Sequence, residues 1–255
     1  MKIVCLLLLL PLLVVGVRGG AISRTSLRWD TACIDVGLAN NIVNRRAVFQ
    51  SAIYELNTRT AACFNLLSSI NDAPDGDWIL VQAGDSCSSF VGRQPSCSYQ
   101  VVTIASGCDA VSVMHEFMHA LGAWHEQQRP DRDTYVDIRY ENVVGLSSGQ
   151  RAVNFDIHPA VKPFGPYDYD SVMHYRSTAF AARGTRTIVT RASGQQGRID
   201  AVKTGLSVGD IATINELVKN KDGGNPPIPP EPHCSPAASN STSAIILLNE
   251  DFIFD

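Results

Sequence analysis

Residues 115–126 constrain this chain more than any other stretch, with the sequence His-Glu-Phe-Met-His-Ala-Leu-Gly-Ala-Trp-His-Glu. His115 and His119 are four residues apart, so on a helix of about 3.6 residues per turn their imidazoles leave the same face and can bind one metal ion. Glu116 lies between them and can reach a water at the metal without taking a coordination place. The stretch therefore predicts a metal site with its own general base.

Gly122 and His125 extend this pattern beyond the helix. A residue without a Cβ can adopt a positive φ, so Gly122 is expected to end the helix and let His125 supply a third ligand from outside it. Three protein ligands leave a fourth position open, which is typical of a catalytic zinc site rather than a structural one. Two histidines four apart also occur by chance on apolar helices, but the two further residues at fixed offsets argue against coincidence.

Residues 1–19 predict a secretory signal peptide. Lys2 precedes an apolar run over residues 3–15, and small residues follow it. A membrane-spanning helix would need about 20 apolar residues, whereas this run contains Pro11 and closes at Arg18. We expect the signal to be removed and the protein to be secreted.

Removal of the signal would take Cys5 with it and leave six of the seven cysteines. An even number fits an oxidising compartment. Six cysteines allow 15 pairings, and the residues alone do not choose among them. The six are Cys33, Cys63, Cys87, Cys97, Cys108 and Cys234.

The formal net charge of −4 argues against nucleic acid as a partner, because phosphate binding needs clustered lysine and arginine. We assign residues 20–222 to one domain and residues 223–255 to a Pro-rich linker and a disordered tail. The tail holds a glycosylation sequon at Asn240. Its apolar residues 244–248 are too few for a membrane or lipid anchor.

Apolar residues recur at intervals of three and four over residues 39–56, which predicts an amphipathic helix. A second helix is expected over residues 110–121, where Met114 and Met118 pack on a sheet rather than bind metal. A third is expected over residues 207–218, with Ser207 as its N-cap. Regular structure should be sparse between His125 and this last helix. Strands are predicted at residues 63–67, 78–82, 87–93 and 99–104.

Residues 171–175, Ser-Val-Met-His-Tyr, form the second informative stretch. Taken alone, Met173 is typical of a core and His174 of a hydrogen-bonded interior histidine. The stretch begins 46 residues after His125, however, where a Met-containing turn passes under the zinc of a metzincin-type protease.

Three further segments make the resemblance specific: residues 90–93 (Phe-Val-Gly-Arg), 129–136 (Arg-Pro-Asp-Arg-Asp-Thr-Tyr-Val) and 154–157 (Asn-Phe-Asp-Ile). Together with the zinc motif and the turn, they resemble the astacin family of secreted zinc endopeptidases over residues 28–218. The resemblance implies an α+β fold, a two-lobed metzincin-like catalytic domain. Its N-terminal lobe would be a twisted mixed sheet with two long helices, and its C-terminal lobe largely irregular with a final helix.

The resemblance also implies roles for single residues. His115, His119 and His125 would bind one Zn²⁺, and Glu116 would be the catalytic base that takes a proton from water and returns it to the leaving amine. Tyr175 would be a further zinc ligand that swings away when substrate binds and then stabilises the oxyanion.

Gly122, Glu126 and Met173 would support the site from beside it. Lys203 stands where family members that favour an acidic residue after the scissile bond have an arginine. It implies a basic pocket with a milder preference for Asp or Glu, because lysine lacks the bidentate fork of arginine. The alternative for Lys203 is a solvated surface lysine.

The implied substrates are proteins or peptides, bound by strand addition at an edge near residues 87–91, and the implied protein is a monomer. Two other interpretations stay open. One is a secreted binding protein that has lost catalysis, against which the retention of Glu116 argues. The other is a small-substrate zinc amidase, which uses the same chemistry.

Among the cysteines, the resemblance implies a disulfide between Cys87 and Cys108. The family's other pair would join Cys63 to a distal cysteine, here Cys234, which lies beyond the linker. Cys33 and Cys97 have no counterpart in the family, and could join each other or change the pairing of Cys63.

In the family, removal of a pro-segment frees an N-terminus that lies near the glutamate after the third histidine, here Glu126. Cleavage after Gly19 would leave residues 20–27 before Arg28, about the length of the family's mature arm. We therefore expect signal cleavage itself to make the active terminus, without a pro-segment. The ammonium of Gly20 would then pair with Glu126, since either charge buried alone would be unfavourable.

Overall fold

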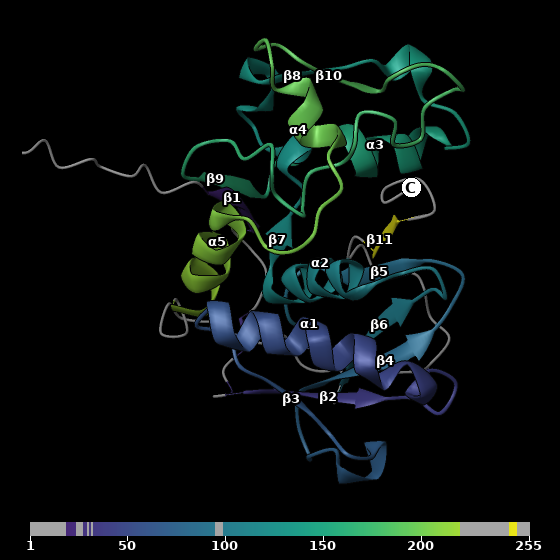
Figure 1. Cartoon of the computed structure of the whole chain (residues 1–255), viewed down its shortest axis with the longest axis vertical. Coiled ribbons are helices and arrows are strands. Elements are labelled where there is room, and N and C mark those ends of the chain that lie inside the picture. The colour runs from purple at the N-terminus through teal and green to yellow at the C-terminus, as the bar shows by residue number, and fades with distance from the viewer. Residues whose placement is uncertain are drawn as a thin grey trace, which may run out of the picture.

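The computed structural model describes residues 19–23, 28, 29, 31, 33–94 and 99–219, together with the backbone of residues 245–248. One lobe is built on a six-stranded sheet, and the other from short strands, helices and loops (Figure 1). This is the two-lobed α+β fold that the sequence predicts. Within the described part of the chain, no helix is long and apolar enough to cross a membrane.

The sheet of the first lobe has the strand order β11-β5-β6-β4-β2-β3. β2, β3, β4 and β6 pair in parallel, whereas β5 runs antiparallel to β6 and β11 antiparallel to β5. The sheet is therefore mixed, as expected, and β2, which the sequence analysis missed, lies inside it. The bounds are β2 Ile34–Leu38, β3 Phe64–Leu66, β4 Trp78–Ala83, β5 Cys87–Phe90, β6 Tyr99–Ile104 and β11 Ile245–Leu248.

Two long helices, α1 (Arg46–Arg59) and α2 (Ala110–Leu121), pack against each other and on this sheet (Figure 1). α1 starts later than residue 39, after a 3₁₀ turn at Val43–Arg45. The Asn41 side chain accepts a hydrogen bond from the Ala83 N–H, 3.2 Å away, which holds the preceding residues in a turn. Both Met114 and Met118 are buried in the core, as predicted.

α2 spans the residues that the sequence predicts, because both of its ends are fixed locally. At the start, the Asp109 carboxylate accepts the Ser112 N–H at 2.9 Å, which satisfies one of the donors that a helix N-terminus leaves unpaired. At the end, Gly122 adopts a left-handed conformation with φ of 111°, which suits a residue without a Cβ.

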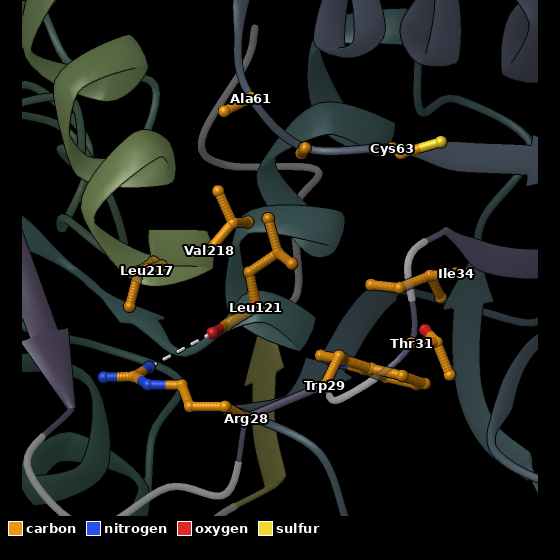
Figure 2. A pocket seen from close by; sticks show the side chains of 10 residues that line it. Arg28, Trp29, Thr31, Ile34, Ala61, Cys63, Leu121, Leu217 and Val218 are labelled. Atoms are coloured by element: carbon orange, nitrogen blue, oxygen red, sulfur yellow. Dashed lines mark hydrogen bonds between the residues drawn. The ribbon is translucent and has the colours of Figure 1, made fainter. Parts of the chain in front are cut away.

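The last carbonyl groups of α2 are covered by the segment that precedes the sheet (Figure 2). The Trp29 indole N–H donates to the Ala120 oxygen at 2.8 Å, and the Arg28 guanidinium donates to the Leu121 oxygen at 3.3 Å. These contacts satisfy acceptors that the end of a helix leaves without partners. A small pocket lies here, and none of the three histidines lines it.

The second lobe contains only short elements, as expected for this part of the chain. β1 (Gly20–Ser23) lies between β7 (Ala123–Trp124) and β9 (Val161–Phe164), antiparallel to both. β8 (Val136–Ile138) pairs with β10 (Ile188–Thr190). The helices are α3 Ser148–Phe155 and α4 Gln196–Asp200, and the 3₁₀ turns beyond α2 are Glu126–Gln128, Arg132–Thr134 and Tyr140–Asn142; a further one lies in the first lobe at Ile70–Asp72.

The final helix, α5 (Val208–Lys219), packs on α2 and β1, which lie far from it in the sequence. Ser207 caps it as predicted, because its hydroxyl accepts the Asp210 N–H while its own N–H donates to the Asp210 carboxylate, both at 2.9 Å. Ile214 and Leu217 are buried in the same core as α1 and α2.

Two disulfides join described residues. Cys87 pairs with Cys108, as the resemblance implied, but Cys63 pairs with Cys33, so the pairing of Cys63 with Cys234 was wrong. The parallel register of β2 with β3 sets Ile34 opposite Phe64, which brings the cysteines just before them to a Cα–Cα distance of 4.5 Å, within the range of a disulfide. Cys97, Cys234, Asn240 and residues 1–18 lie outside the described residues.

Candidate active site

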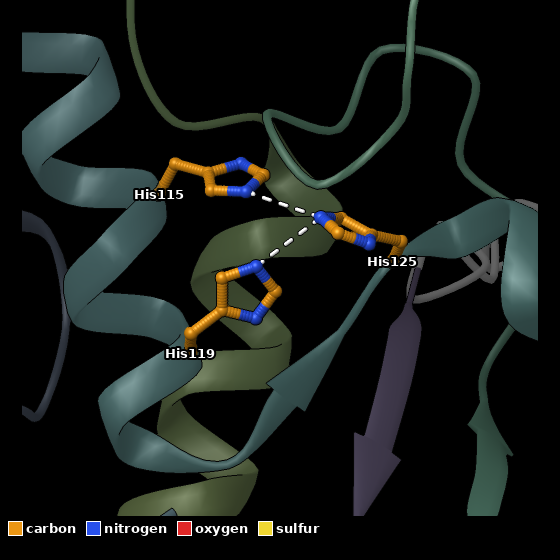
Figure 3. Close-up of side chains that lie close together, drawn as sticks. All are labelled: His115, His119 and His125. Carbon is orange, nitrogen blue, oxygen red and sulfur yellow. Dashed lines mark hydrogen bonds between the residues drawn. The ribbon is translucent and has the colours of Figure 1, made fainter. Parts of the chain in front are cut away.

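Three histidine side chains meet in the interior between the two lobes. His115 and His119 come from one face of α2, and His125 follows β7 after the turn at Gly122 (Figure 3). The Nε2 atom of His125 lies 3.2 Å from that of His119 and 3.3 Å from that of His115. The structure therefore brings the three predicted ligands together, with one ligand atom of each converging on the same place.

The other ring nitrogen of each histidine has a hydrogen-bond acceptor. Nδ1 lies 2.7 Å from the Val172 oxygen in His115 and 2.8 Å from the Ala123 oxygen in His119. In His125 it lies 3.1 Å from the side-chain oxygen of Gln128. An oxygen that can only accept requires the proton on Nδ1, so each Nε2 presents a lone pair.

Burial keeps these rings neutral. It lowers the pKa of His115 to about 4. Burial, together with the neighbouring histidines, lowers the pKa of His119 and of His125 well below the ordinary value. Three neutral imidazoles with converging lone pairs cannot hydrogen-bond to one another, whereas a cation between them binds all three. The residues present therefore fit a metal ion.

Glu116 lies on α2 between the first two ligands and is fully buried. Because Glu116 directly follows His115 in α2, its carboxylate is close to the ligands, but it is not one of the three converging ligand groups. With three protein nitrogens converging, the site has the composition of an open catalytic centre rather than a closed structural one.

The turn at residues 171–175 lies directly against the ligands. The Val172 carbonyl accepts from His115, and the Met173 carbonyl accepts the Glu126 N–H at 3.0 Å. Met173 is itself buried in the core of the first lobe. The turn thus holds the first ligand and the residue after the third one in place.

Tyr175 is fully buried and its ring centroid lies 4.5 Å from that of His125. Its hydroxyl donates to the side-chain oxygen of Asn154 at 2.7 Å. The Asn154 amide nitrogen donates to the Gln150 carbonyl at 2.8 Å, which fixes which end of the amide faces the tyrosine. The structure therefore brings Tyr175 beside the third ligand, His125, and adds a partner on α3.

Sequence reasoning missed three side chains that position these residues. Gln127 accepts the Tyr175 N–H with its side-chain oxygen at 3.2 Å, and Gln128 holds the ring of His125 while donating to the Val153 carbonyl at 2.6 Å. Asn154 is the third. Its only signal in the sequence was its place in a family-like segment, and the two glutamines directly follow Glu126.

Glu126 is buried beside the site and pairs with the Arg129 guanidinium at 3.3 Å. Burial raises the pKa of Glu126 well above its ordinary value, while Arg129 lowers it and Asp168 and Asp210 raise it further. Within the described residues, the second oxygen of this carboxylate has no hydrogen-bond partner. Gly20 is the first residue of β1. The next residue, Ala21, pairs with Trp124, which lies two residues before Glu126.

Lys203 is half-buried rather than on an open surface. Its ammonium donates to the carbonyl oxygens of Tyr169 at 2.9 Å and Arg198 at 2.8 Å. Burial lowers the pKa of Lys203, and the nearby Asp170 raises it. The structure therefore gives this side chain two backbone partners and does not place it among the three histidines.

The fold and the site together define a metzincin-type domain: two lobes, three histidines from a helix and the chain that follows it, and a Met-containing turn against them. Residues 21–219 match the family model Astacin, which describes a family of peptidases. The chain belongs to this family. Its cofactor is accordingly zinc, and the three histidines are positioned to bind it.

Individual relatives agree with this assignment. The chain is 32% identical over 199 residues to zinc metalloproteinase nas-4 of Caenorhabditis elegans. This match covers 77% of this chain and 61% of that protein. It is 39% identical over 147 residues to meprin A subunit beta of Homo sapiens, covering 57% and 20%. The solved structure of high choriolytic enzyme 1, a hatching enzyme zinc-protease from Oryzias latipes, matches with a TM-score of 0.64 at 28% identity, over 77% of this chain and 94% of that one.

This chain spans only part of the length of several relatives. It is 40% identical over 157 residues to zinc metalloproteinase dpy-31 of Teladorsagia circumcincta, and this match covers 61% of the chain but 25% of that protein.

Proposed function

We propose that this protein is a secreted, zinc-dependent endopeptidase. The observation that carries the proposal is the convergence of three Nε2 lone pairs, with the carboxylate of Glu116 on the same helix between two of their donors. Membership of the astacin family supports the same activity.

His115, His119 and His125 would hold the metal. When bound, zinc supplies Lewis-acid chemistry, which lowers the pKa of a water toward about 7 and polarises a carbonyl group. Glu116 takes the proton from the attacking water and returns it to the leaving amine. Tyr175 donates a hydrogen bond to the developing oxyanion after it leaves its partner Asn154.

A peptide fits this site better than a small amide because a strand edge lies beside it. The outer edge of β5 accepts an extended chain segment in antiparallel pairing, since β11 lies there. The Gly92 N–H, just beyond β5, donates to the His119 carbonyl at 2.8 Å, which ties this edge to the metal-binding helix. An extended substrate paired with β5 would therefore run past the three histidines.

Lys203 would give a mild preference for Asp or Glu just after the scissile bond. Its ammonium has three protons, and two of them are donated to carbonyl groups, so one remains for a substrate carboxylate. Cleavage-site profiling of wild type and Lys203→Ala tests this. We expect the acidic preference to fall in the variant, and identical profiles would remove Lys203 from the specificity pocket.

We further propose that residues 1–19 are a secretory signal and that cleavage after Gly19 exposes the ammonium of Gly20 to Glu126. The unpartnered oxygen of the buried Glu126 carboxylate supports this, because a buried carboxylate is stabilised by a paired cation. N-terminal sequencing of the secreted protein tests it. A start well downstream of residue 21 would contradict it.

The activity itself is tested by assaying the purified protein on a mixed peptide library with and without a chelator. Glu116→Gln should retain zinc, measured by metal analysis, and lose at least about two orders of magnitude in turnover, because general-base catalysis typically contributes that much. Gln is matched in size and leaves the ligands unchanged. Hydrolysis that persists in this variant would contradict the role of Glu116, and the absence of any peptide hydrolysis in wild type would contradict the function.

A further inference from the structure

The outer edge of the first lobe's sheet is occupied by a segment from the far end of the same chain. β11 (Ile245–Leu248) pairs antiparallel with β5, with residue 245 opposite Phe90 and residue 248 opposite Cys87. In Figure 1, β11 (yellow) lies along β5 beside α2, on the side that faces α3 of the second lobe. Without β11, β5 would be the edge strand of the sheet.

This edge is the one next to the metal site. β5 packs against α2, and the chain directly after it is hydrogen-bonded to the carbonyl of His119. The other side of β5 is paired with β6 through Ser88 and Ser89. Only one edge of β5 is therefore open to a further strand, and a substrate that adds to it needs the same backbone groups that β11 uses.

We propose that residues 245–248 act as a built-in competitive inhibitor, which occupies the substrate edge of β5 until a peptide displaces it. The inference rests on the proposed endopeptidase function. Two strands cannot pair with the same edge, so binding of the tail and binding of an extended substrate exclude each other.

The chain between α5 and β11 is long enough for this placement. The 25 residues 220–244 can span up to roughly 80 Å when extended, which exceeds the diameter of about 45 Å expected for a domain of this size. A tethered segment on such a linker has an effective concentration in the millimolar range. Even a peptide that binds weakly would then occupy the edge for much of the time.

Proline substitutions in the full-length chain test the proposal. Successive N–H groups of a strand point to opposite sides, so Ile246→Pro with Leu247→Pro removes a donor toward β5 whichever residue provides it. We expect this double variant to lower KM for a peptide substrate by about three- to tenfold and to leave kcat unchanged. A matched control, Ala238→Pro with Ser239→Pro, adds the same residues between the Pro-rich linker and β11 and should leave KM at the wild-type value.

A synthetic peptide of residues 243–255 provides the second readout. Added to the Ile246→Pro, Leu247→Pro variant, it should raise KM again without lowering kcat, as a competitive inhibitor does. Equal KM values for wild type and this variant would overturn the inference while leaving the endopeptidase function intact.

If no form of the protein hydrolyses peptides, the proposed function fails. A binding measurement then still tests whether residues 245–248 occupy the edge of β5. Fluorescence anisotropy of the labelled 243–255 peptide should then show saturable binding to the double proline variant and weaker binding to wild type, where the edge is already occupied. Absence of binding to both would overturn the inference.

Discussion

The two lobes reach a folded state by different means. The first is a sheet with α1 and α2 packed on it, and most of its buried residues are apolar. The second has few regular elements, and much of its interior consists of polar side chains that bind backbone groups. Arg132, for example, is buried and donates to the carbonyl groups of Gln127 and Phe155. Both lobes have a cluster of buried apolar side chains, but the second depends in addition on individual hydrogen bonds from buried polar side chains.

The metal ligands follow this division. His115 and His119 are fixed by a helix whose position the apolar core determines. His125 and Tyr175 are held by the amide side chains of Gln128, Gln127 and Asn154. Substitutions in the two lobes should consequently differ in kind, and the predictions below test this difference from the largest expected effect to the smallest.

Phe117→Ala should cause the largest loss of stability, by about 4 kcal/mol. Phe117 is fully buried in α2 and its ring stacks on that of Phe64 with a centroid distance of 5.0 Å, so truncation leaves a cavity. Tyr54→Ala is the control, because Tyr54 is 71% exposed and should change stability by no more than about 0.5 kcal/mol. Urea unfolding measures both. Similar losses for the two variants would show that apolar burial does not dominate this lobe.

Arg129→Met should cost about 3 kcal/mol, because it removes the buried guanidinium that is paired with Glu126 and Asp131. Arg129 is 1% exposed, and it also donates to the carbonyl groups of Gly165 and Pro166. Met retains much of its length and apolar character, so the loss comes mainly from charge and hydrogen bonds.

The control for this variant is Arg191→Met. The guanidinium of Arg191 is paired with Asp137 at 2.6 Å, but its side chain is 52% exposed, and exposed ion pairs contribute at most about 1 kcal/mol. If both variants lost the same stability in urea unfolding, the burial of the Arg129 network would not matter and the contrast between the lobes would fail.

The same contrast explains which features could be predicted from the sequence. α2 was predicted to the residue because its apolar periodicity and the glycine at its end are local signals. β2 was missed because all but one of its residues are buried and the strand lacks alternation. β1 was missed because it has four residues and both of its partners lie some hundred residues away or more in the sequence.

The metal ligands could be predicted from the sequence, whereas the side chains that hold the site residues in place could not. His115, His119 and His125 stand at fixed offsets that the chemistry of one metal ion requires. Gln127, Gln128 and Asn154 act through contacts that depend on where α3 packs, and no spacing rule encodes them. The capping box of α3, Ser147 with Gln150, was present in the sequence, but too few apolar residues followed it to indicate a helix.

Asn154→Leu should raise kcat by up to about tenfold, because the hydroxyl of Tyr175 no longer has to give up a hydrogen bond worth about 1.4 kcal/mol before it reaches the oxyanion. Leucine is close to asparagine in size and cannot accept a hydrogen bond. Steady-state kinetics on a peptide substrate provides the measurement. The control is the same substitution in a Tyr175→Phe background, where no hydroxyl remains and Asn154→Leu should have little further effect. An equal change in both backgrounds, or a loss in wild type, would mean that Asn154 acts through the packing of α3 rather than through the hydroxyl of Tyr175.

The smallest effect concerns the pH dependence of stability in the polar interior. Burial raises the pKa of Asp210 to about 6, against the hydrogen bonds from Ser171, Val172 and Ser207 that lower it. A folded-state pKa above the unfolded value of 3.8 means that the ionised carboxylate destabilises the folded protein above pH 6, and that this cost disappears as the pH falls through 6 toward 3.8. Between pH 7 and pH 5, wild type should therefore gain about 1 kcal/mol relative to Asp210→Asn, which cannot take up the proton. Urea unfolding of both proteins at the two pH values isolates the contribution of Asp210, because every other side chain is common to both. A difference that stays constant, or that grows in favour of the variant at pH 5, would show that the three hydrogen bonds outweigh burial at this position.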